Sequence, residues 1–311
     1  MKPRGWANIA SGLPVALLLH YNFRMPLRRF SALFVYLLVV VCLPRTAEGQ
    51  PPRASYSGRT LLLPRRIVSG ERATLAVLDS SGRLAPGVVV NFSNGDRLTT
   101  DATGRAMFVA PLDAGVIFAS ITGRTDRVLS VILTPAEAST SSIEIASVPR
   151  FASLADRFEV LGKGFCGDAD ANQVRISGRS ALVLASSPVS LSVLPAVDLD
   201  PGDASVEISC AKRIARPFGL SLVGLDLEAD DLPLKPDERR ALTVRVRGTT
   251  EKISLEARNL APAVAELAGG RLLQVLSSGG TRNQARFEVT GRKDGNFQIA
   301  IRLVPDMVAP H

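Results

Sequence analysis

The stretch Leu242-Thr243-Val244-Arg245-Val246-Arg247 alternates apolar and polar residues. Successive side chains of a β-strand point to opposite faces, so this period of two predicts a strand that is buried on one face and solvated on the other. The same alternation recurs at residues 253–258, 285–290 and 297–302, with Gly, Asp and Asn between such runs at 94–96, 101–104, 278–280 and 294–296. Short strands bounded by turn residues predict an all-β fold built from antiparallel sandwiches.

Helical patterns are few in this chain. No stretch longer than two turns keeps apolar residues at the i, i+3 and i+4 positions that an amphipathic helix needs. The best candidate is 262–268, which precedes Gly269 and Gly270. This segment fits a helix, a strand or an irregular crossover.

The N-terminal region has the order of a secretory signal. Arg28 and Arg29 precede a fourteen-residue apolar run at 30–43, and the small-residue pattern Ala47-Glu48-Gly49 follows. We expect cleavage before Gln50, with folding outside the cytoplasm. The apolar run is shorter than the roughly 20 residues of a membrane-spanning helix.

Three alternatives to a removed signal peptide at 1–49 remain open. The leader would stay as an N-terminal anchor if the second apolar stretch at 9–19 contributes to it. A start at Met25 would give a leader of ordinary length. Residues 39–42 resemble a lipoprotein cleavage box, although Val41 stands where that pattern needs a small residue.

Removing the leader changes the charge of the protein. Six basic residues and one acidic residue leave with it, which lowers the formal net charge from +8 to +3. In the remaining chain Lys and Arg alternate with Asp and Glu. Nucleic-acid-binding proteins concentrate basic residues on one face, so we expect no nucleic-acid partner.

Histidine and tryptophan are missing from the predicted mature body. His20 and Trp6 lie in the leader, His311 is the last residue, and Tyr56 is the only tyrosine after the leader. The composition therefore excludes a Ser-His-Asp or Cys-His mechanism and an imidazole-ligated metal site. We expect no enzymatic activity and no cofactor. Carbohydrate binding by aromatic stacking is disfavoured for the same compositional reason.

Two changes in composition divide the body into blocks. Residues 134–142 are rich in Pro, Ala, Ser and Thr, and residues 224–236 cluster Asp and Glu with two prolines. Both segments are predicted linkers. They delimit domains at 55–134, 143–224 and 237–305, a size ordinary for immunoglobulin-type sandwiches.

The first block contains Val68-Ser69-Gly70, the strand-like run 75–79, the run 86–92 and the segment 99–108. On these residues it resembles the bacterial immunoglobulin-like repeats of adhesins and surface proteins. The resemblance implies a sandwich that acts as a stalk, a spacer or an adhesive unit.

The second block contains Ile143-Glu144-Ile145, the run 158–165 with its Gly162-Lys163-Gly164-Phe165 turn, the run 174–178, and Pro201-Gly202. On these residues it resembles the IPT/TIG family of immunoglobulin-like domains. The Gly162-Lys163-Gly164 sequence lacks the third glycine and the following helix of a dinucleotide loop, so we interpret it as a strand-ending turn. The third block matches no family, and we expect either a third sandwich or a shorter, partly open sheet.

Cys166 and Cys210 both fall in the second block and are the only cysteines left after removal of Cys42. In an oxidising compartment we expect them to form a disulfide. In the chain-entropy model, closing this loop would stabilise the domain by about 4 kcal/mol. A reactive thiol or a metal pair is the alternative, and it has no histidine partner.

Two acidic loops contain carboxylates of the kind that bind calcium, which often rigidifies extracellular repeats. The first begins like an EF-hand loop, but Gln173 and Arg179 occupy positions that require glycine and glutamate. The second surrounds Pro201-Gly202, where Asp favours turns. We therefore predict no metal site, with weak calcium candidates at Asp168, Asp170, Asp198, Asp200 and Asp203.

The sequence predicts a non-catalytic, exported protein of the cell envelope or the extracellular space. Its tandem sandwiches are expected to adhere or to act as a scaffold for protein or envelope components, with membrane contact only through a retained leader. The alternative is an accessory or ligand-binding subunit that positions a separate enzyme. A catalytic protein that uses carboxylates alone would require paired acids in one cleft.

Overall fold

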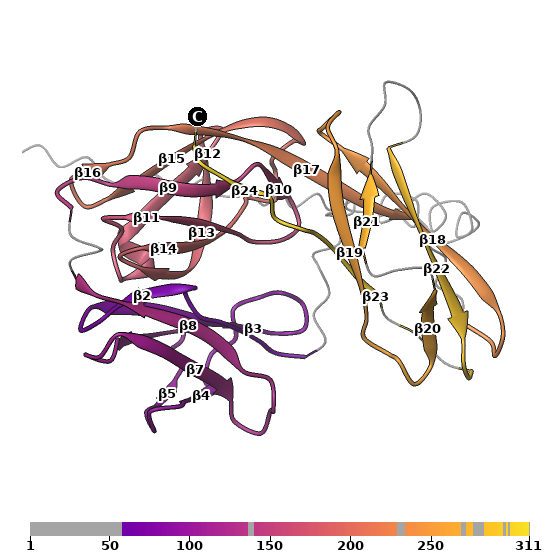
Figure 1. Cartoon of the computed structure of the whole chain (residues 1–311), viewed down its shortest axis with the longest axis horizontal. Coiled ribbons are helices and arrows are strands. Elements are labelled where there is room, and N and C mark those ends of the chain that lie inside the picture. Colours follow the sequence, from indigo (N-terminus) through magenta and orange to yellow (C-terminus); the bar gives the residue numbers. More distant parts are fainter. Residues whose placement is uncertain are drawn as a thin grey trace, which may run out of the picture. The chain divides into compact units, whose positions relative to one another are not determined.

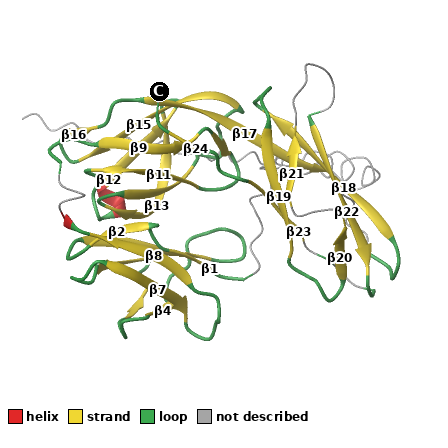
Figure 2. Ribbon diagram, in the orientation of Figure 1, coloured by secondary structure: helices red, strands yellow, loops and turns green. Residues whose placement is uncertain are grey.

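The computed structural model describes residues 58–135, 140–228, 234–268, 283–294, 297 and 299–310, and the backbone of 272–275. Within these residues the protein is almost entirely β, as predicted; its helical residues are those of the short 3-10 helix η1 (Ala169–Ala171) and Pro135 (Figure 2). None of the helices in this part is long and apolar enough to span a membrane. The predicted leader at 1–49 lies outside the described residues.

The first sandwich, residues 58–134, has two facing sheets, drawn in indigo to magenta in Figure 1. Three strands pair in the order β1-β3-β6, and five pair in the order β2-β8-β7-β4-β5. Its strands are β1 (Thr60–Leu62), β2 (Arg66–Val68), β3 (Arg72–Leu78), β4 (Val89–Phe92), β5 (Arg97–Thr99), β6 (Arg105–Val109), β7 (Gly115–Ile121) and β8 (Val128–Leu133). The core between the sheets includes Ile67, Leu75, Val90 and Ile117.

The strand pairing identifies this sandwich as immunoglobulin-like. In chain order the strands take the positions A, A′, B, C, C′, E, F and G, so that one sheet is ABE and the other is A′GFCC′. The pairing of β2 with β8 is parallel and the other pairings are antiparallel. The first strand of the chain is therefore divided between the two sheets.

The second sandwich repeats this arrangement. Its strands are β9 (Glu144–Pro149), β10 (Phe151–Ser153), β11 (Phe158–Lys163), β12 (Asn172–Ile176), β13 (Arg179–Ser187), β14 (Ser190–Leu194), β15 (Gly202–Cys210), β16 (Arg213–Ile214) and the first half of β17 (Phe218–Glu228). The strand β10 pairs in parallel with β17, just as β2 pairs with β8. The long strand β13 joins the two sheets, because residues 179–181 pair with β12 and residues 182–187 pair with β14.

The third sandwich begins inside the expected linker at 224–236. Residues 224–228 are not a linker but the second half of β17, and they pair with β18. The other strands are β18 (Arg239–Arg247), β19 (Ile253–Asn259), β20 (Ala265–Ala268), β21 (Leu272–Val275), β22 (Gln284–Gly291) and β23 (Ile299–Leu303). They form sheets in the orders β17-β18-β22-β20 and β21-β19-β23. The candidate helix at 262–268 contains a turn followed by strand β20.

The third sandwich differs from the other two at its F strand. In the first sandwich the F strand, β7, lies between β4 and β8, and its inward side chains Ile117 and Ala119 are buried. The corresponding strand β23 pairs only with β19 among the described residues, and its Ile299 and Ile301 are only partly buried. After β23 the chain returns to the second sandwich, where β24 (Met307–Val308) pairs with β9.

Candidate functional site

Cys166 and Cys210 form a disulfide, as expected from the composition, with their Cα atoms 5.9 Å apart. Cys210 ends β15 with its side chain in the core, and Cys166 lies in the loop between β11 and β12. The side-chain amide of Asn172 organises this loop: it donates to the carbonyls of Cys166 and Asp168 at 2.9 and 2.8 Å and accepts from Cys166 N at 2.9 Å. The covalent bond and these hydrogen bonds hold the loop in one conformation.

The same loop contacts strand β3 of the first sandwich. The Thr74 hydroxyl donates to the Gly167 carbonyl at 2.7 Å and accepts from Ala169 N at 3.1 Å. A Cβ at position 167 would lie 2.0 Å from the Arg72 carbonyl oxygen. Only glycine fits there, so the close approach of the two backbones depends on Gly167.

Arg105, the first residue of β6, connects the two sandwiches through a buried guanidinium. Its side chain is 7% exposed; it donates to the carbonyls of Val183 at 2.6 Å and Leu184 at 3.3 Å, and it pairs with the Asp170 carboxylate at 3.1 Å. The pairing register of β13 shifts between Val183 and Ala185. Such a bulge leaves backbone groups unpaired, and the guanidinium satisfies two of them.

Apolar residues complete the contact around Arg105. Leu184 at the bulge packs in a cluster that is separate from the three sandwich cores; its buried members are Leu62, Ala76, Leu78, Leu184 and Ala185.

Polar groups also join the two sandwiches. The hydroxyl of Ser187 donates to the Arg66 carbonyl at 2.6 Å. Burial raises the pKa of the Glu159 carboxyl, and Arg65 at 3.7 Å opposes that shift. We call these contacts, together with those of Thr74, Gly167 and Arg105, the first interface.

The second and third sandwiches share strand β17. Its residues 218–222 pair with β15 and its residues 224–228 pair with β18, so one continuous backbone belongs to both. Next to this junction Arg247 donates two hydrogen bonds to Asp226, at 2.6 and 3.0 Å, and they raise the pKa of the guanidinium. Gly248 is required here, because a Cβ would lie 2.3 Å from the Leu222 carbonyl oxygen.

The structure gives most of the weak calcium candidates protein partners. Asp168 caps η1 by accepting from Asp170 N, Asp170 pairs with Arg105, Asp198 lies 3.5 Å from Arg179, and Asp203 accepts from the Ser221 hydroxyl at 2.8 Å. Asp200 lies within electrostatic reach of Arg247. In the part of the chain that the structure describes, no three Asp, Glu, His or Cys residues gather as a metal site would require.

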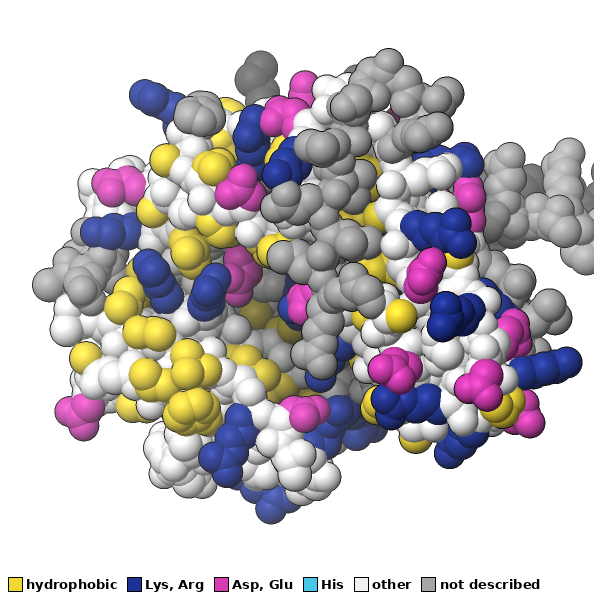
Figure 3. All heavy atoms as spheres, turned by 45° about the vertical axis from the view of Figure 1, so that its right-hand side comes forward, with side chains coloured by type: hydrophobic (Ala, Val, Ile, Leu, Met, Phe, Trp, Pro, Cys, Tyr) yellow, Lys and Arg dark blue, Asp and Glu magenta, His cyan; other side chains and the backbone are white. Residues whose placement is uncertain are grey.

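The outer face of the five-stranded sheet in the first sandwich carries exposed apolar residues. Val116 and Phe118 on β7 are 50% and 38% exposed, and Leu129 on β8 is 44% exposed. Phe118 pairs directly with Leu129, and Val116 pairs with the half-buried Val131. Figure 3 shows hydrophobic side chains gathered on the left of the view, with Lys or Arg side chains above and below them. We call Val116, Phe118, Leu129 and Val131 the apolar ladder.

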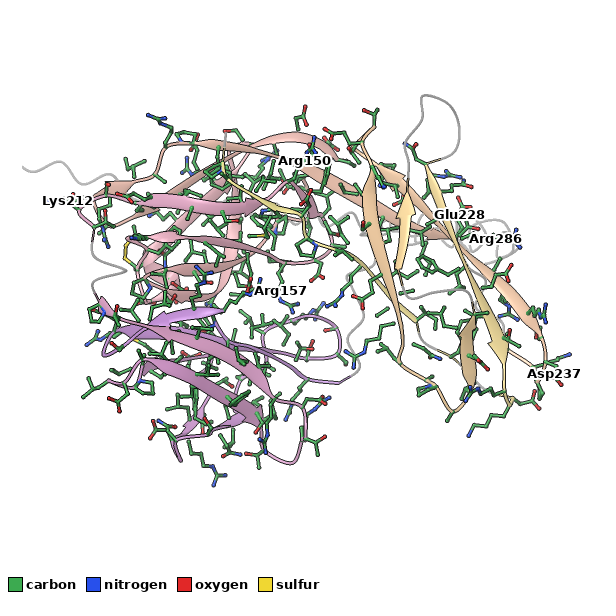
Figure 4. The ribbon with its side chains drawn as sticks, in the orientation of Figure 1. Arg150, Arg157, Lys212, Glu228, Asp237 and Arg286 are labelled. Atoms are coloured by element: carbon green, nitrogen blue, oxygen red, sulfur yellow. A yellow bond between two sulfur atoms is a disulfide. The ribbon has the colours of Figure 1, made fainter. Side chains whose placement is uncertain are left out.

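A groove of about 440 Å³ lies on the second sandwich. Its lining includes Ser205 on β15, Gly219 on β17 and residues 308–310. Arg150, which lies between β9 and β10 (Figure 4), is also part of the lining. This guanidinium is already occupied, because it pairs with Glu251 and stacks over the Phe151 ring.

Sequence reasoning missed Arg105 and Leu184. Nothing in the sequence around Arg105 distinguishes it from the many arginines that alternate with apolar residues, and Leu184 lies in an ordinary apolar run. The close approach at Gly167 had one available signal, which was a glycine directly after a cysteine in an acidic loop. That signal indicates a turn as readily as a contact.

No family model and no curated protein matches this chain. Among solved structures, it is similar to the Bacteroides ovatus mixed-linkage glucan utilization locus protein SGBP-B in complex with a heptasaccharide, with 10% identity over 82% of this chain and 76% of that one, at a TM-score of 0.33. It is also similar to the I9–I11 tandem of titin (8% identity, 81% and 97% covered, TM-score 0.23) and to domains 1–6 of the surface layer protein SbsC (11% identity, 82% and 39% covered, TM-score 0.19). At these TM-scores the likenesses carry no functional argument, and the immunoglobulin-like assignment rests on the strand pairing.

Proposed function

We propose that this chain is an exported, non-catalytic scaffold whose immunoglobulin-like sandwiches hold a binding face in a fixed orientation. The buried Arg105 contact carries the proposal. Linkers between independent domains are usually exposed and carry few contacts, whereas here a buried guanidinium, a glycine-dependent backbone contact and an apolar cluster join the first two sandwiches. Such extensive contacts between domains are expected in a protein that holds a surface in a fixed orientation, and not in one whose domains move about a hinge.

The finer assignments belong to the same proposal. The first sandwich is a bacterial immunoglobulin-like repeat and the second is an IPT/TIG-type domain, and the leader at 1–49 directs export and is then removed. The disulfide between Cys166 and Cys210 supports an extracytoplasmic location, because such bonds persist in oxidising compartments. Adhesion to protein or envelope components is the expected activity.

The experiment that tests export expresses the full chain with its own N-terminus and fractionates the cells. We expect the protein outside the cytoplasm, with a mature N-terminus at Gln50 and a Cys166–Cys210 bridge in non-reducing mass spectrometry. A chain that is recovered in the cytosol with both thiols free would overturn the proposal.

The groove on the second sandwich favours a second candidate function, an accessory subunit that binds a small ligand for a separate enzyme. Gly219 offers a direct test, because a Cβ at this position meets no atom within 4 Å. The Gly219→Trp variant should therefore fold and fill the groove. Thermal-shift screening with envelope glycans and peptides should find a ligand that stabilises the wild type but not this variant; a screen without such a ligand removes the candidate.

A further inference from the structure

We propose that the apolar ladder and three surrounding arginines dock the first sandwich on an anionic lipid bilayer. The proposal deepens the proposed function and rests on it, since an exported scaffold folds next to an envelope membrane. The ladder consists of Val116, Phe118, Leu129 and Val131, which alternate with buried residues on two adjacent strands.

The matching face of the second sandwich is the internal control. There the F and G strands are β15 and β17, and the residues exposed on the outer face are Asp203, Ser205, Glu207 and Gly219, with Ser221 half-buried beside them. The same two strand positions therefore carry polar residues in one sandwich and apolar residues in the other. The fold does not require the ladder, and exposed apolar clusters of this kind mark interaction sites.

The strand register places arginines around the ladder. Arg66 on β2 pairs with Val131, so its side chain continues the row formed by Val131 and Val116. On the other side, Arg97 pairs with Asn91, and Arg127 comes one residue before Val128, which pairs with Ala119. Because paired residues point to the same face of a sheet, all three arginines lie on the face of the ladder; Arg66 is next to it, whereas β4 separates Arg97 from it.

The charge of this face is one-sided. Arg66, Arg97 and Arg127 are exposed, and none of them forms a salt bridge among the residues that the structure describes, although Arg66 lies within electrostatic reach of Glu159 in the second sandwich. The outward positions of strands β2, β8, β7, β4 and β5 carry no Asp or Glu. Two copies of the face would bring like charges together, which disfavours a dimer through it. An anionic partner with an apolar interior fits both features.

A bilayer surface supplies this combination. Arginine forks bind phosphate oxygens in pairs, while apolar side chains beside them enter the boundary between headgroups and acyl chains. On the ladder the arginines stand at the border and the apolar residues in the middle, so a single approach of the sheet face satisfies both. The attraction should weaken as salt screens the charges.

Flotation of the full chain with vesicles tests the proposal. The probes are vesicles of phosphatidylcholine with roughly 40% of the anionic lipid phosphatidylglycerol, and vesicles of phosphatidylcholine alone. We expect binding to the anionic vesicles only. Replacing Val116, Phe118 and Leu129 together by Ser should weaken binding at least about tenfold, and each of Arg66→Gln and Arg127→Gln about fivefold.

Matched controls remove exposed residues elsewhere in the chain. Leu227→Ser and Ile214→Ser delete apolar side chains that are 49% and 73% exposed, and Arg258→Gln and Arg286→Gln delete exposed arginines. These variants should bind as the wild type does. Circular dichroism checks that every variant folds, which is expected because each change is on the surface.

Three outcomes would overturn the inference. The wild type fails to bind anionic vesicles, the ladder variants bind as well as the wild type, or the wild type self-associates through the ladder without binding lipid. If the chain is exported and disulfide-bonded but does not bind vesicles, the membrane inference is wrong and the proposed function is unaffected. If the chain is reduced and cytosolic but binds vesicles through the ladder, the proposed function is wrong and the binding of the ladder to lipid is unaffected.

Discussion

Two turns in the first sandwich have the same local structure and different roles. Asp79-Ser80-Ser81-Gly82-Arg83 and Asp101-Ala102-Thr103-Gly104-Arg105 share the pattern Asp, any residue, Ser or Thr, Gly, Arg. In each turn one carboxylate oxygen accepts from the hydroxyl two residues later and from the arginine amide, and glycine adopts a positive φ of 75° or 74°. Arg83 is exposed, whereas the Arg105 side chain is buried in the first interface.

The comparison separates what a short sequence decides from what the surrounding fold decides. The Asp and the Gly suffice to build the turn, because an Asx hydrogen bond and a left-handed residue are local features. The role of the arginine depends on a β-bulge 79 residues later in the chain, at Leu184. The sequence around Arg105 does not predict that its partner is the bulge at Leu184.

The largest expected effect comes from replacing the two arginines by alanine. Arg105→Ala leaves the carbonyls of Val183 and Leu184 without a donor, and it should lower the free energy of unfolding by about 3 kcal/mol. Arg83→Ala should change it by less than about 0.5 kcal/mol. Urea unfolding monitored by circular dichroism measures both, and equal effects would contradict the assigned role of Arg105.

Replacing the two aspartates should give a smaller difference. Asp79→Ala and Asp101→Ala each remove hydrogen bonds to the turn and should lower the free energy of unfolding by less than Arg105→Ala does. The loss at Asp101 should be the larger one, because that turn also positions Arg105. Asparagine at either site should restore part of the stability, since its oxygen still accepts the amide hydrogen bonds. Indistinguishable losses would mean that Arg105 does not need its turn.

Lowering the pH should reduce the contribution of both turns to the free energy of unfolding. Hydrogen bonds from Ser81 and Thr103 lower the pKa of the Asp79 and Asp101 carboxyls from 3.8. A lowered folded-state pKa means that the stabilisation is present above the unfolded value and disappears as pH falls through the folded value. The double variant Asp79→Asn/Asp101→Asn should therefore show a flatter stability curve below about pH 4. Burial raises the pKa of Glu159, so the stability that this group contributes should be present at low pH and be lost as pH rises. Glu159→Gln is the control variant that removes this opposite contribution.

The fold was predictable to the extent that it is local. Alternation located β18, β19 and β22, and the location of Cys166 and Cys210 in one domain indicated their pairing. The acidic, proline-containing segment at 224–236 predicted a linker, but residues 224–228 gain a strand partner in β18 and belong to β17. Composition describes a segment, whereas pairing depends on what lies beside it.

The candidate sites were less accessible to sequence reasoning for the same physical reason. The carboxylates of the acidic loops are visible as a cluster, yet Asp170 pairs with Arg105 and Asp203 with Ser221. Strand β7 of the apolar ladder has apolar residues on both faces, so its sequence does not show which of them stay exposed. Register, which places Arg66 beside Val131, emerges only when the strands assemble.

The most direct test of the account is the distance between the first two sandwiches in solution. Spin labels at Asp113→Cys and Lys212→Cys, in a chain with Cys42→Ser, report that distance by double electron–electron resonance from exposed sites. We predict one narrow distance distribution in this chain and in its Arg83→Ala variant, and a broad distribution after Arg105→Ala. A broad distribution before any arginine is changed, or a narrow one that survives Arg105→Ala, would contradict the claim that this buried guanidinium locks the scaffold.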